Sequence, residues 1–333
     1  MNTTQLGASG PRVAQLGLGC MGMSDLYGPA DRDESIATIR AALDAGITLL
    51  DTGDFYGMGD NELLIRDALA GRDREQAIIS VKFGALRDPA GGWTGQDGRP
   101  QAVKNFAAYS LKRLGVEYID IYRPARVDPS VPIEETVGAI AELVQAGYVR
   151  HIGLSEVSAD TLRRAHAVHS ISDVQIEYSM ISRGIENGLL QTARELGVGI
   201  TAYGVLSRGL ISGHWSKARA GEADFRGLFS PRFQGANLDS NLALVERVRT
   251  IAAEMGVSVA QVAIAWVMAQ GADIVPLVGA RRRDRLEEAL GAAQLVLSAQ
   301  DLARLEAAVP KESAAGPRYN DYLMAHLDSE VRA

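Results

Sequence analysis

Short apolar runs alternate with segments in which apolar residues recur every three or four positions along most of the chain. The short runs are typical of buried strands, and the longer period is typical of amphipathic helices. The predicted strands are 16–19, 48–52, 77–82, 118–122, 149–154, 173–178, 199–203 and 273–278. The predicted helices that follow them are 33–45, 61–69, 102–114, 133–146, 159–168, 186–196, 259–269 (which precedes the last strand) and 283–290.

Eight strand–helix units in near-strict alternation favour an α/β fold in which a parallel sheet closes into a (β/α)8 TIM barrel. A Rossmann domain is not expected, because no G-x-G-x-x-G opens a helix after the first predicted strand. No Pro/Ser-rich linker divides the chain, so we predict one domain over residues 1–333. Segments 241–255 and 299–308 read as two helices outside the repeat.

Polar residues with matching chemistry follow the second and third predicted strands. The apolar run 47–50 ends in Asp51, Tyr56 follows in a Gly-rich loop, and the next strand delivers Lys82. A lysine close to a phenol stabilises the phenolate and lowers the tyrosine pKa, and an aspartate keeps the lysine charged. The order therefore predicts one proton-transfer site with Tyr56 as acid or base. Taken singly, each residue has a structural explanation; the three together in this order favour chemistry.

Composition narrows the class of protein. Hydrophobic residues make up 47% and charged residues 23%, the net charge is −7 and the pI is about 5.4, so a nucleic acid is not expected as partner. The single cysteine, Cys20, excludes an intrachain disulfide. We see no signal peptide and no apolar stretch of membrane-spanning length. We expect a cytoplasmic protein with a small-molecule partner, monomeric or weakly homo-oligomeric.

The segment Asp51-Thr52-Gly53-Asp54-Phe55-Tyr56-Gly57 resembles the Asp-Thr-Ala-x-x-Tyr-Gly motif of the aldo-keto reductases, with Gly53 for the usual alanine. The resemblance covers essentially the whole chain. Segments 157–178 and 316–319 resemble a bacterial and plant branch described as auxin-induced-like or perakine-reductase-like. The resemblance implies an NAD(P)H-dependent enzyme, catalytic roles for Asp51, Tyr56 and Lys82, and an N-terminal hairpin that closes the barrel bottom.

The fourth strand departs from the family pattern. The family carries Tyr-x-x-His-Arg-x-Asp-Pro there, and its histidine hydrogen-bonds the substrate carbonyl; this chain has Ala125 at the histidine position. Alanine has no donor, and Arg123 and Arg126 are the nearest ones in sequence. We predict Arg123 and Ala125 in the substrate pocket. Arg126 has a structural alternative, which is an ion pair with Asp128.

The resemblance also implies the residues that bind the cofactor. Ser155 and Gln175 match the side chains that hold the nicotinamide carboxamide, although Gln175 is also consistent with a polar residue at a sheet edge. Glu156 replaces the usual asparagine and offers the carboxamide an acceptor. Tyr203 would stack on the nicotinamide. The backbone after it would cradle the pyrophosphate through Gly204, Leu206, Arg208 and Gly209.

The last strand leads into an arginine-rich helix start. Positive charge at a helix N-terminus opposes the helix dipole, so a compensating anion is expected there. The family binds the adenosine 2′-phosphate and adenine at this place, which implies NADPH/NADP+ as cofactor. The matching residues are Gly279, Arg281, Arg285 and Glu288. A solvated basic turn is the alternative.

Aromatic residues outside the repeat have two interpretations. Trp93 and the aromatic residues of the insert 211–237 either wall the substrate pocket or pack. His166 and His169 have no evident third ligand, and we predict no metal.

Three functions stay open at this point. The first is NADPH-dependent reduction of an aldehyde or ketone, with Tyr56 as proton donor. The second, kept open by Ala125, is an NADPH-binding regulatory or sensor protein with little turnover. The third is a dehydrogenase that acts chiefly on alcohols or sugars.

Overall fold

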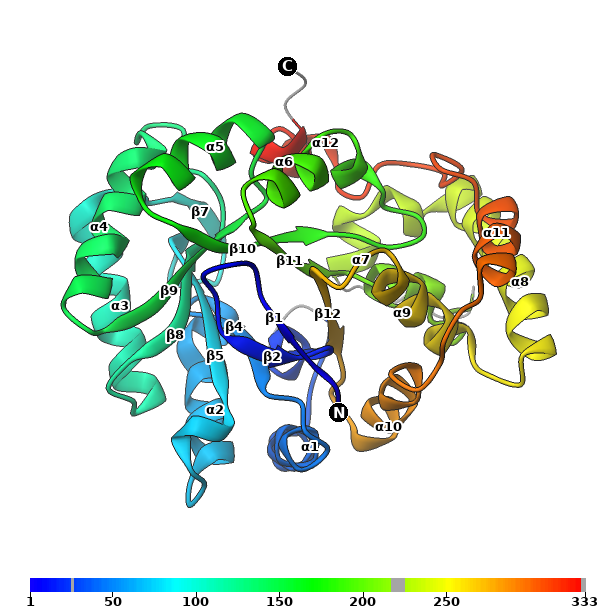
Figure 1. The fold of residues 1–333 in the computed structure, drawn as a ribbon, viewed down its shortest axis with the longest axis horizontal. Coiled ribbons are helices and arrows are strands. Elements are labelled where there is room, and N and C mark those ends of the chain that lie inside the picture. The colour runs from blue at the N-terminus through cyan, green and yellow to red at the C-terminus, as the bar shows by residue number, and fades with distance from the viewer. Residues whose placement is uncertain (25–26, 217–224, 331–333) are drawn as a thin grey trace.

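Eight parallel strands close into a barrel in the computed structural model, which describes residues 1–24, 27–216 and 225–330 (Figure 1). Around the barrel the strands follow the order β10-β11-β12-β3-β4-β5-β8-β9. Their bounds are β3 (Gly17–Gly19), β4 (Leu49–Gly53), β5 (Ile78–Phe83), β8 (Ile119–Pro124), β9 (Val149–Ser155), β10 (Ile171–Glu177), β11 (Gly199–Tyr203) and β12 (Ile274–Gly279). The predicted (β/α)8 barrel is confirmed.

Helices surround this barrel (Figure 1). Those of the repeat are α1 (Arg32–Asp44), α2 (Asp60–Leu69), α3 (Pro100–Leu114), α4 (Ile133–Gln145), α5 (Ala159–Val168), α6 (Leu189–Glu195), α9 (Val259–Ala269) and α10 (Arg283–Ala292). The helices outside it are α7 (Phe225–Phe229), α8 (Gly235–Glu254), α11 (Ala299–Ala308) and α12 (Asp321–Met324). Helix α8 begins at Gly235 rather than at the predicted 241, because its first turn, Gly-Ala-Asn, is too poor in apolar residues to carry the helical pattern.

A short antiparallel hairpin, β1 (Thr3–Gln5) with β2 (Arg12–Ala14), covers the amino-terminal end of the barrel, as predicted. The backbone N–H of Ala14 donates to Thr48 Oγ1 at 3.0 Å, just before β4. Leu6 and Val13 pack with Leu49 in a small core cluster that fills the bottom of the barrel. The functional end is therefore the opposite one, where the strands end and the following loops gather.

A second hairpin was not predicted. After β5, the strands β6 (Ala85–Arg87) and β7 (Trp93–Gln96) pair antiparallel. Its turn is held by Asp88, whose side chain accepts from the Gly92 N–H at 2.7 Å, and by Gly91 with a φ of +83°. The strands are three and four residues long and partly exposed, so they carry no apolar run that would have marked them.

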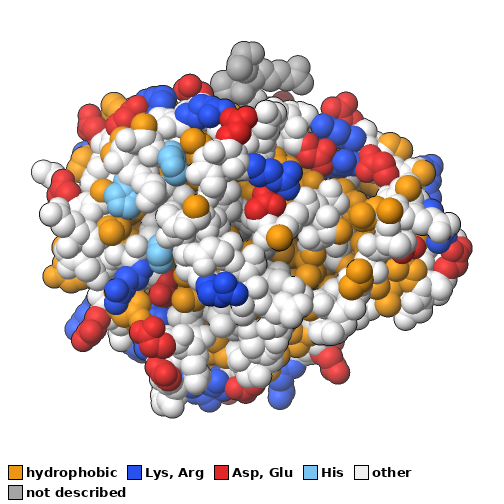
Figure 2. Space-filling model, in the orientation of Figure 1, with side chains coloured by type: hydrophobic (Ala, Val, Ile, Leu, Met, Phe, Trp, Pro, Cys, Tyr) orange, Lys and Arg blue, Asp and Glu red, His pale blue; other side chains and the backbone are white. Residues whose placement is uncertain are grey.

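The surface carries no sign of a basic face on the side shown in Figure 2, where acidic and basic side chains are interspersed. Among the described residues, no single helix is long and apolar enough to cross a membrane. Only the bent pair α8–α9 meets the length and composition of a membrane span.

No group of three or more potential metal ligands is found among the residues that the structure describes. His166 accepts from the Ile171 N–H, and His169 contacts the carbonyl of Ser170.

Candidate active site

The structure brings Asp51, Tyr56 and Lys82 together at the carboxyl ends of two adjacent strands. Lys82 pairs in register with Gly53, and its Nζ lies 2.5 Å from Asp51 Oδ2. Both side chains are buried, with 5% and 7% of their surface exposed. Tyr56 lies in the turn after β4, and Lys82 Nζ is 5.0 Å from the centroid of its ring.

Burial decides the protonation state of Tyr56. It raises the pKa of the phenol well above its usual value, Asp51 adds to the rise, and Arg126 opposes it. The sequence suggested a lowered pKa, but Lys82 is paired with Asp51, and burial lowers the pKa of the lysine itself. A phenol that keeps its proton at neutral pH is suited to donate it rather than to act as a base.

Asp51 is the centre of a buried hydrogen-bond network. Gln175 Nε2 donates to Asp51 Oδ1 at 2.7 Å, and Ser80 Oγ donates to the same oxygen at 3.1 Å. Ser80 in turn accepts from Arg123 Nη2 at 3.0 Å. These partners fix the direction of the Asp51 carboxylate and hence of the lysine.

Arg123 lies below this network and not at the mouth of the barrel. Its side chain is fully buried and pairs with Asp173 at 2.8 Å, and it also donates to Thr201. We therefore assign it no contact with a substrate. Because side chains alternate along a strand, residue 125 faces the same side as Arg123, one layer nearer the mouth. Ala125 is 3% exposed, and its N–H donates to the Phe83 carbonyl at 2.8 Å.

The end of β9 differs from the expectation. Ser155 is buried, and its hydroxyl has no hydrogen-bond partner among the described residues. The carboxylate of Glu156 is already occupied: Arg318 donates to its two oxygens at 2.8 and 2.5 Å, and Tyr203 Oη donates to Oε1 at 2.7 Å. Ser329 Oγ donates to Oε2 at 2.5 Å. The expected role of Glu156 as acceptor for a carboxamide is therefore replaced by a bond to the C-terminal segment.

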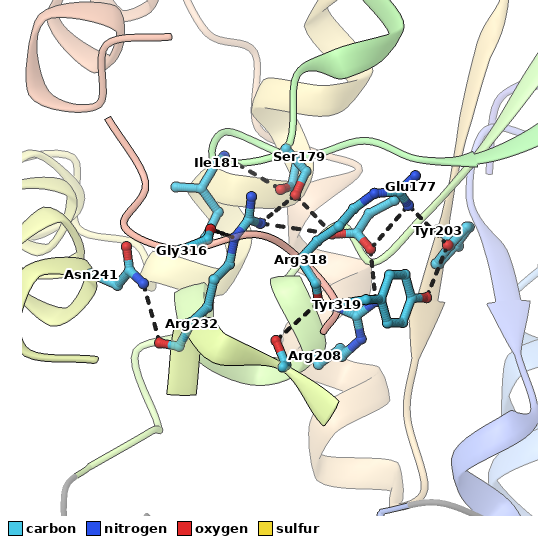
Figure 3. Close-up of polar contacts among 12 residues, drawn as sticks. Glu177, Ser179, Ile181, Tyr203, Arg208, Arg232, Asn241, Gly316, Arg318 and Tyr319 are labelled. Carbon is cyan, nitrogen blue, oxygen red and sulfur yellow. Dashed lines mark hydrogen bonds and ion pairs between the residues drawn. The ribbon is translucent and has the colours of Figure 1, made fainter. Parts of the chain in front are cut away.

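A second buried carboxylate extends this arrangement (Figure 3). Glu177 accepts from Arg208 at 2.8 Å and from Ser182 at 2.7 Å, and it lies 3.6 Å from Arg318 and 3.8 Å from Arg232. We call these side chains the mouth cluster; its members are Glu156, Glu177, Arg208, Arg232 and Arg318. Burial alone would raise the pKa of both carboxyls, but the arginines outweigh it and hold both below their usual range.

The mouth cluster fastens the C-terminal segment over the barrel. Tyr319 lies with its ring 4.3 Å from the guanidinium of Arg208 and its hydroxyl 3.2 Å from that of Tyr203 (Figure 3). The N–H of Ser329 donates to the Glu156 carbonyl at 3.1 Å. Sequence reasoning missed Arg318 as a site residue; an arginine in the tail together with glutamate in place of asparagine was the available signal.

The loop after β11 has a strained backbone. Ser207, Arg208 and Gly209 have φ values of +46°, +57° and +95°, and Gly204 has +64°. Non-glycine residues adopt such values at a cost and cluster at ligand sites. The buried hydroxyl of Ser207 has no hydrogen-bond partner in the described part of the chain. Leu206, which lies between Gly204 and Ser207, is partly buried and packs on the core.

At the start of α10, the arginines have partners within the chain. Arg281 donates to the carbonyls of Tyr27, Gly28 and Pro29 at 2.9–3.2 Å. Arg285 is 3.1 Å from Glu288, which also binds His214 at 2.9 Å. Neighbouring Arg282 and Arg283 pair with Asp284 and Glu34. Carboxylates therefore supply part of the compensation for which the sequence suggested a phosphate. A Cβ on Gly279 would meet nothing within 4 Å, so the backbone there is open to a close approach.

The predicted aromatic residues separate into two groups. Trp93 is 40% exposed and lies 5.6 Å from Phe55, whose ring is 4.8 Å from that of Tyr56. Trp93 thus stands one ring away from the phenol. Trp215 and Phe233 are buried, pack on each other at 4.8 Å and belong to the core. Two predicted residues remain. Phe229 ends α7 and is partly buried, whereas Phe225 starts α7 and its side chain lies outside the described part of the structure.

Comparison with known proteins shows the family to which the chain is similar. The sequence model of the Aldo/keto reductase family matches residues 15–310. The chain is 43% identical over 318 residues to a probable aldo-keto reductase 1 of Glycine max, covering 95% of this chain and 91% of that one. A glycerol dehydrogenase from Gluconobacter oxydans is similar with a TM-score of 0.84 and 26% identity, over 99% of this chain and 97% of that one. An aldo-keto reductase from Bacillus halodurans in its holo form has a TM-score of 0.77 and 26% identity, over 93% and 96%.

Proposed function

The chain belongs to the aldo/keto reductase family and is an oxidoreductase, and from this premise we propose that it reduces an aldehyde or ketone to an alcohol with NADPH. The observation that carries the proposal is the meeting of three buried side chains at the mouth of the barrel: Lys82 is paired with Asp51, and its Nζ lies 5.0 Å from the centroid of the Tyr56 ring. Tyr56 is the proton donor. Lys82 and Asp51 orient it and set its electrostatic surroundings.

Two buried hydroxyls test whether the mouth fits a nicotinamide dinucleotide. Ser155 and Ser207 lie at the end of β9 and after β11, and neither hydroxyl has a hydrogen-bond partner among the described residues. Buried polar groups without partners are rare in native proteins, and a ligand explains them. They support a carboxamide next to Ser155 and the pyrophosphate next to Ser207.

The chemistry divides between the cofactor and the chain. A reduced nicotinamide, when bound, supplies the hydride that adds to the carbonyl carbon. Tyr56 Oη donates its proton to the carbonyl oxygen, which completes the alcohol. Lys82 stabilises the phenolate that remains until it regains a proton from solvent, and Asp51 keeps the lysine charged.

Other residues bind and orient. Tyr203 is held by its hydroxyl to Glu156, so its ring is fixed for stacking on the nicotinamide. Gln175 is fixed through its amide nitrogen on Asp51, which leaves its oxygen to accept from the carboxamide. Gly204, Leu206, Arg208 and Gly209 are assigned to the pyrophosphate, and Gly279, Arg281, Arg285 and Glu288 to the 2′-phosphate and adenine.

The test is NADPH oxidation over a panel of aromatic and aliphatic aldehydes and ketones, with the alcohol identified as product. Tyr56→Phe keeps the ring and removes the proton, so the rate should fall by about 10²–10⁴-fold. Tyr109→Phe is the matched control, because Tyr109 is 57% exposed on α3. Full activity of Tyr56→Phe would contradict the assignment of the proton donor.

One observation favours a second function. Ala125 supplies no donor where the family has histidine, and a barrel that binds NADPH with little turnover, as a sensor, would not need one. Tight NADPH binding without turnover of any carbonyl in the panel would favour the sensor; turnover that requires Tyr56 favours the enzyme.

A further inference from the structure

Arg126 differs from the other arginines at the mouth of the barrel. It follows Ala125 just beyond β8, is partly buried, and donates from Nη1 to the carbonyl of Ala125 at 2.6 Å. Across the described residues it forms no ion pair. The ion pair with Asp128 that the sequence left open does not form: Asp128 accepts from Ser130 at 2.6 Å and from the Gly98 N–H at 2.9 Å.

The surrounding charges have partners of their own. Arg208 is paired with Glu177, Arg318 with Glu156, and Lys82 with Asp51. Glu156 is thereby taken up by the tail and is not available as the counter-ion of Arg126. Glu156 lies beyond ion-pair distance of Arg126, so a bound anion could become a direct partner of the guanidinium.

Arg126 lies just beyond β8, which pairs with β5, the strand that carries Lys82. Burial raises the pKa of Tyr56, and the charge of Arg126 partly opposes that rise. Burial lowers the pKa of Lys82, and the charge of Arg126 lowers it further. Burial lowers the pKa of Arg126 itself. The combined effects of Tyr203, Tyr319 and Glu156 outweigh burial and raise that pKa above its usual value. The strand pairing and these electrostatic effects together place Arg126 on the side of the barrel mouth that carries Lys82 and Tyr56.

We propose that Arg126 binds a carboxylate on the substrate, so that the enzyme acts on aldehydes and ketones that carry a carboxylate. This inference rests on the proposed carbonyl reduction and names its substrate class. A guanidinium binds a carboxylate through two parallel N–H···O bonds, and only one Arg126 N–H group has a partner in the described part of the chain. The single positive charge of Arg126 balances the single negative charge of one carboxylate.

The assignment also accounts for Ala125. The family's histidine positions the carbonyl oxygen directly, whereas here the small side chain leaves room beside Arg126. Binding of a non-reacting group can orient the reacting one. A substrate held at its carboxylate by Arg126 is aligned for Tyr56 without the imidazole, and a neutral aldehyde is not.

The test compares 4-carboxybenzaldehyde with its methyl ester, which has the same ring and the same reacting carbonyl. With NADPH we expect kcat/KM to favour the acid by about 10- to 100-fold, as a charged hydrogen-bonded contact typically gives. In Arg126→Met this acid-to-ester ratio should fall to near one, mainly through KM. Arg126→Lys keeps the positive charge but loses the two parallel N–H donors of the guanidinium, so its acid-to-ester ratio should be intermediate.

Arg150→Met is the matched control. Arg150 is exposed at the start of β9, at the other end of the barrel, and stacks on Tyr118. Removing its charge should leave the ratio unchanged. A wild-type ratio near one, or a ratio that survives in Arg126→Met, would overturn the assignment.

A binding measurement separates this inference from the proposed function. Calorimetry of the NADP+-loaded protein with 4-methylbenzoate should show binding that weakens about tenfold or more in Arg126→Met. If both aldehydes are inert but this binding is present and depends on Arg126, the proposed reduction fails and the carboxylate site stands. If the wild type reduces the ester but does not bind 4-methylbenzoate, the carboxylate site fails and the reduction stands.

Discussion

Replacing Arg318 by methionine removes the cation that holds the buried carboxylate of Glu156. Glu156 is fully buried, and the arginine side chain is only 8% exposed. Methionine keeps an apolar stem but leaves the carboxylate with the hydroxyls of Ser329 and Tyr203 as its remaining side-chain donors. Removing one partner of a buried pair costs about 3–5 kcal/mol, because the other charge stays buried without compensation. We expect Arg318→Met to destabilise the protein by that amount.

Urea unfolding measures this cost as a shift of the midpoint at unchanged slope. Adding Glu156→Gln to Arg318→Met removes the uncompensated charge, so the double variant should regain part of the lost free energy. The coupling between the two substitutions should reach roughly 1–3 kcal/mol. The control pair is Arg163 with Glu195, which lies at 2.6 Å but is 49% and 45% exposed, and whose removal should cost about 0–1 kcal/mol. Simple additivity at Glu156 and Arg318, or a shift no larger than that of the control, would refute the reasoning.

The same pair predicts a pH dependence. The pKa of Glu156 is depressed in the folded protein, so its contribution is present above the unfolded value of about 4.3 and is lost as the pH falls through the folded one. Amide hydrogen exchange in residues 316–330 should therefore stay slow from neutral pH to about pH 5, after correction for intrinsic rates, and become faster only in acid. Faster exchange on going from pH 5 to pH 8 would have the wrong sign.

Three further predictions follow from other parts of the site. NADPH should bind about 10- to 100-fold more tightly than NADH, and replacing Arg281 and Arg285 by alanine should remove most of the preference; equal dissociation constants in the wild type would contradict it. Ala125→His should raise kcat/KM for small neutral aldehydes and lower it for a bulky or carboxylate-bearing substrate by crowding, and unchanged kinetics in both series would show that residue 125 does not face the carbonyl. Burial, with Glu62 adding to it, raises the pKa of Asp54 to about 8, so the free energy of unfolding should fall as the pH rises from about 4 to 8; Asp54→Asn should flatten that slope, and an unaltered slope would contradict the assignment.

The barrel could be predicted because its strands are apolar runs with abrupt polar ends. The run 47–50 ends in Asp51, and the structure places β4 there with its residues fully or almost fully buried. Helices with a clear period were placed well; α11 has the predicted bounds. The β6–β7 hairpin was missed because its pairing depends on a turn around Gly91, and neither strand faces a core large enough to leave a pattern.

The residues proposed as catalytic could be grouped from sequence because parallel strands end at one edge, whatever the details of the loops. The partner of Glu156 could not, since Arg318 is 162 residues away and no local pattern links the two. Arg126 and Asp128 illustrate the opposite error. They are close in sequence, which made an ion pair between them one alternative, but Asp128 is engaged by Ser130 and Gly98 and the pair does not form.

The account depends most on Tyr56 as the donor of the proton. The most direct test is the single-turnover rate of NADPH oxidation by Tyr56→Phe, mixed rapidly with 4-carboxybenzaldehyde, beside the dissociation constant of NADPH for the same variant. We predict a rate at least about 100-fold below that of the wild type, with NADPH affinity within a few-fold. A wild-type rate with wild-type affinity would contradict the account, because another group would then supply the proton.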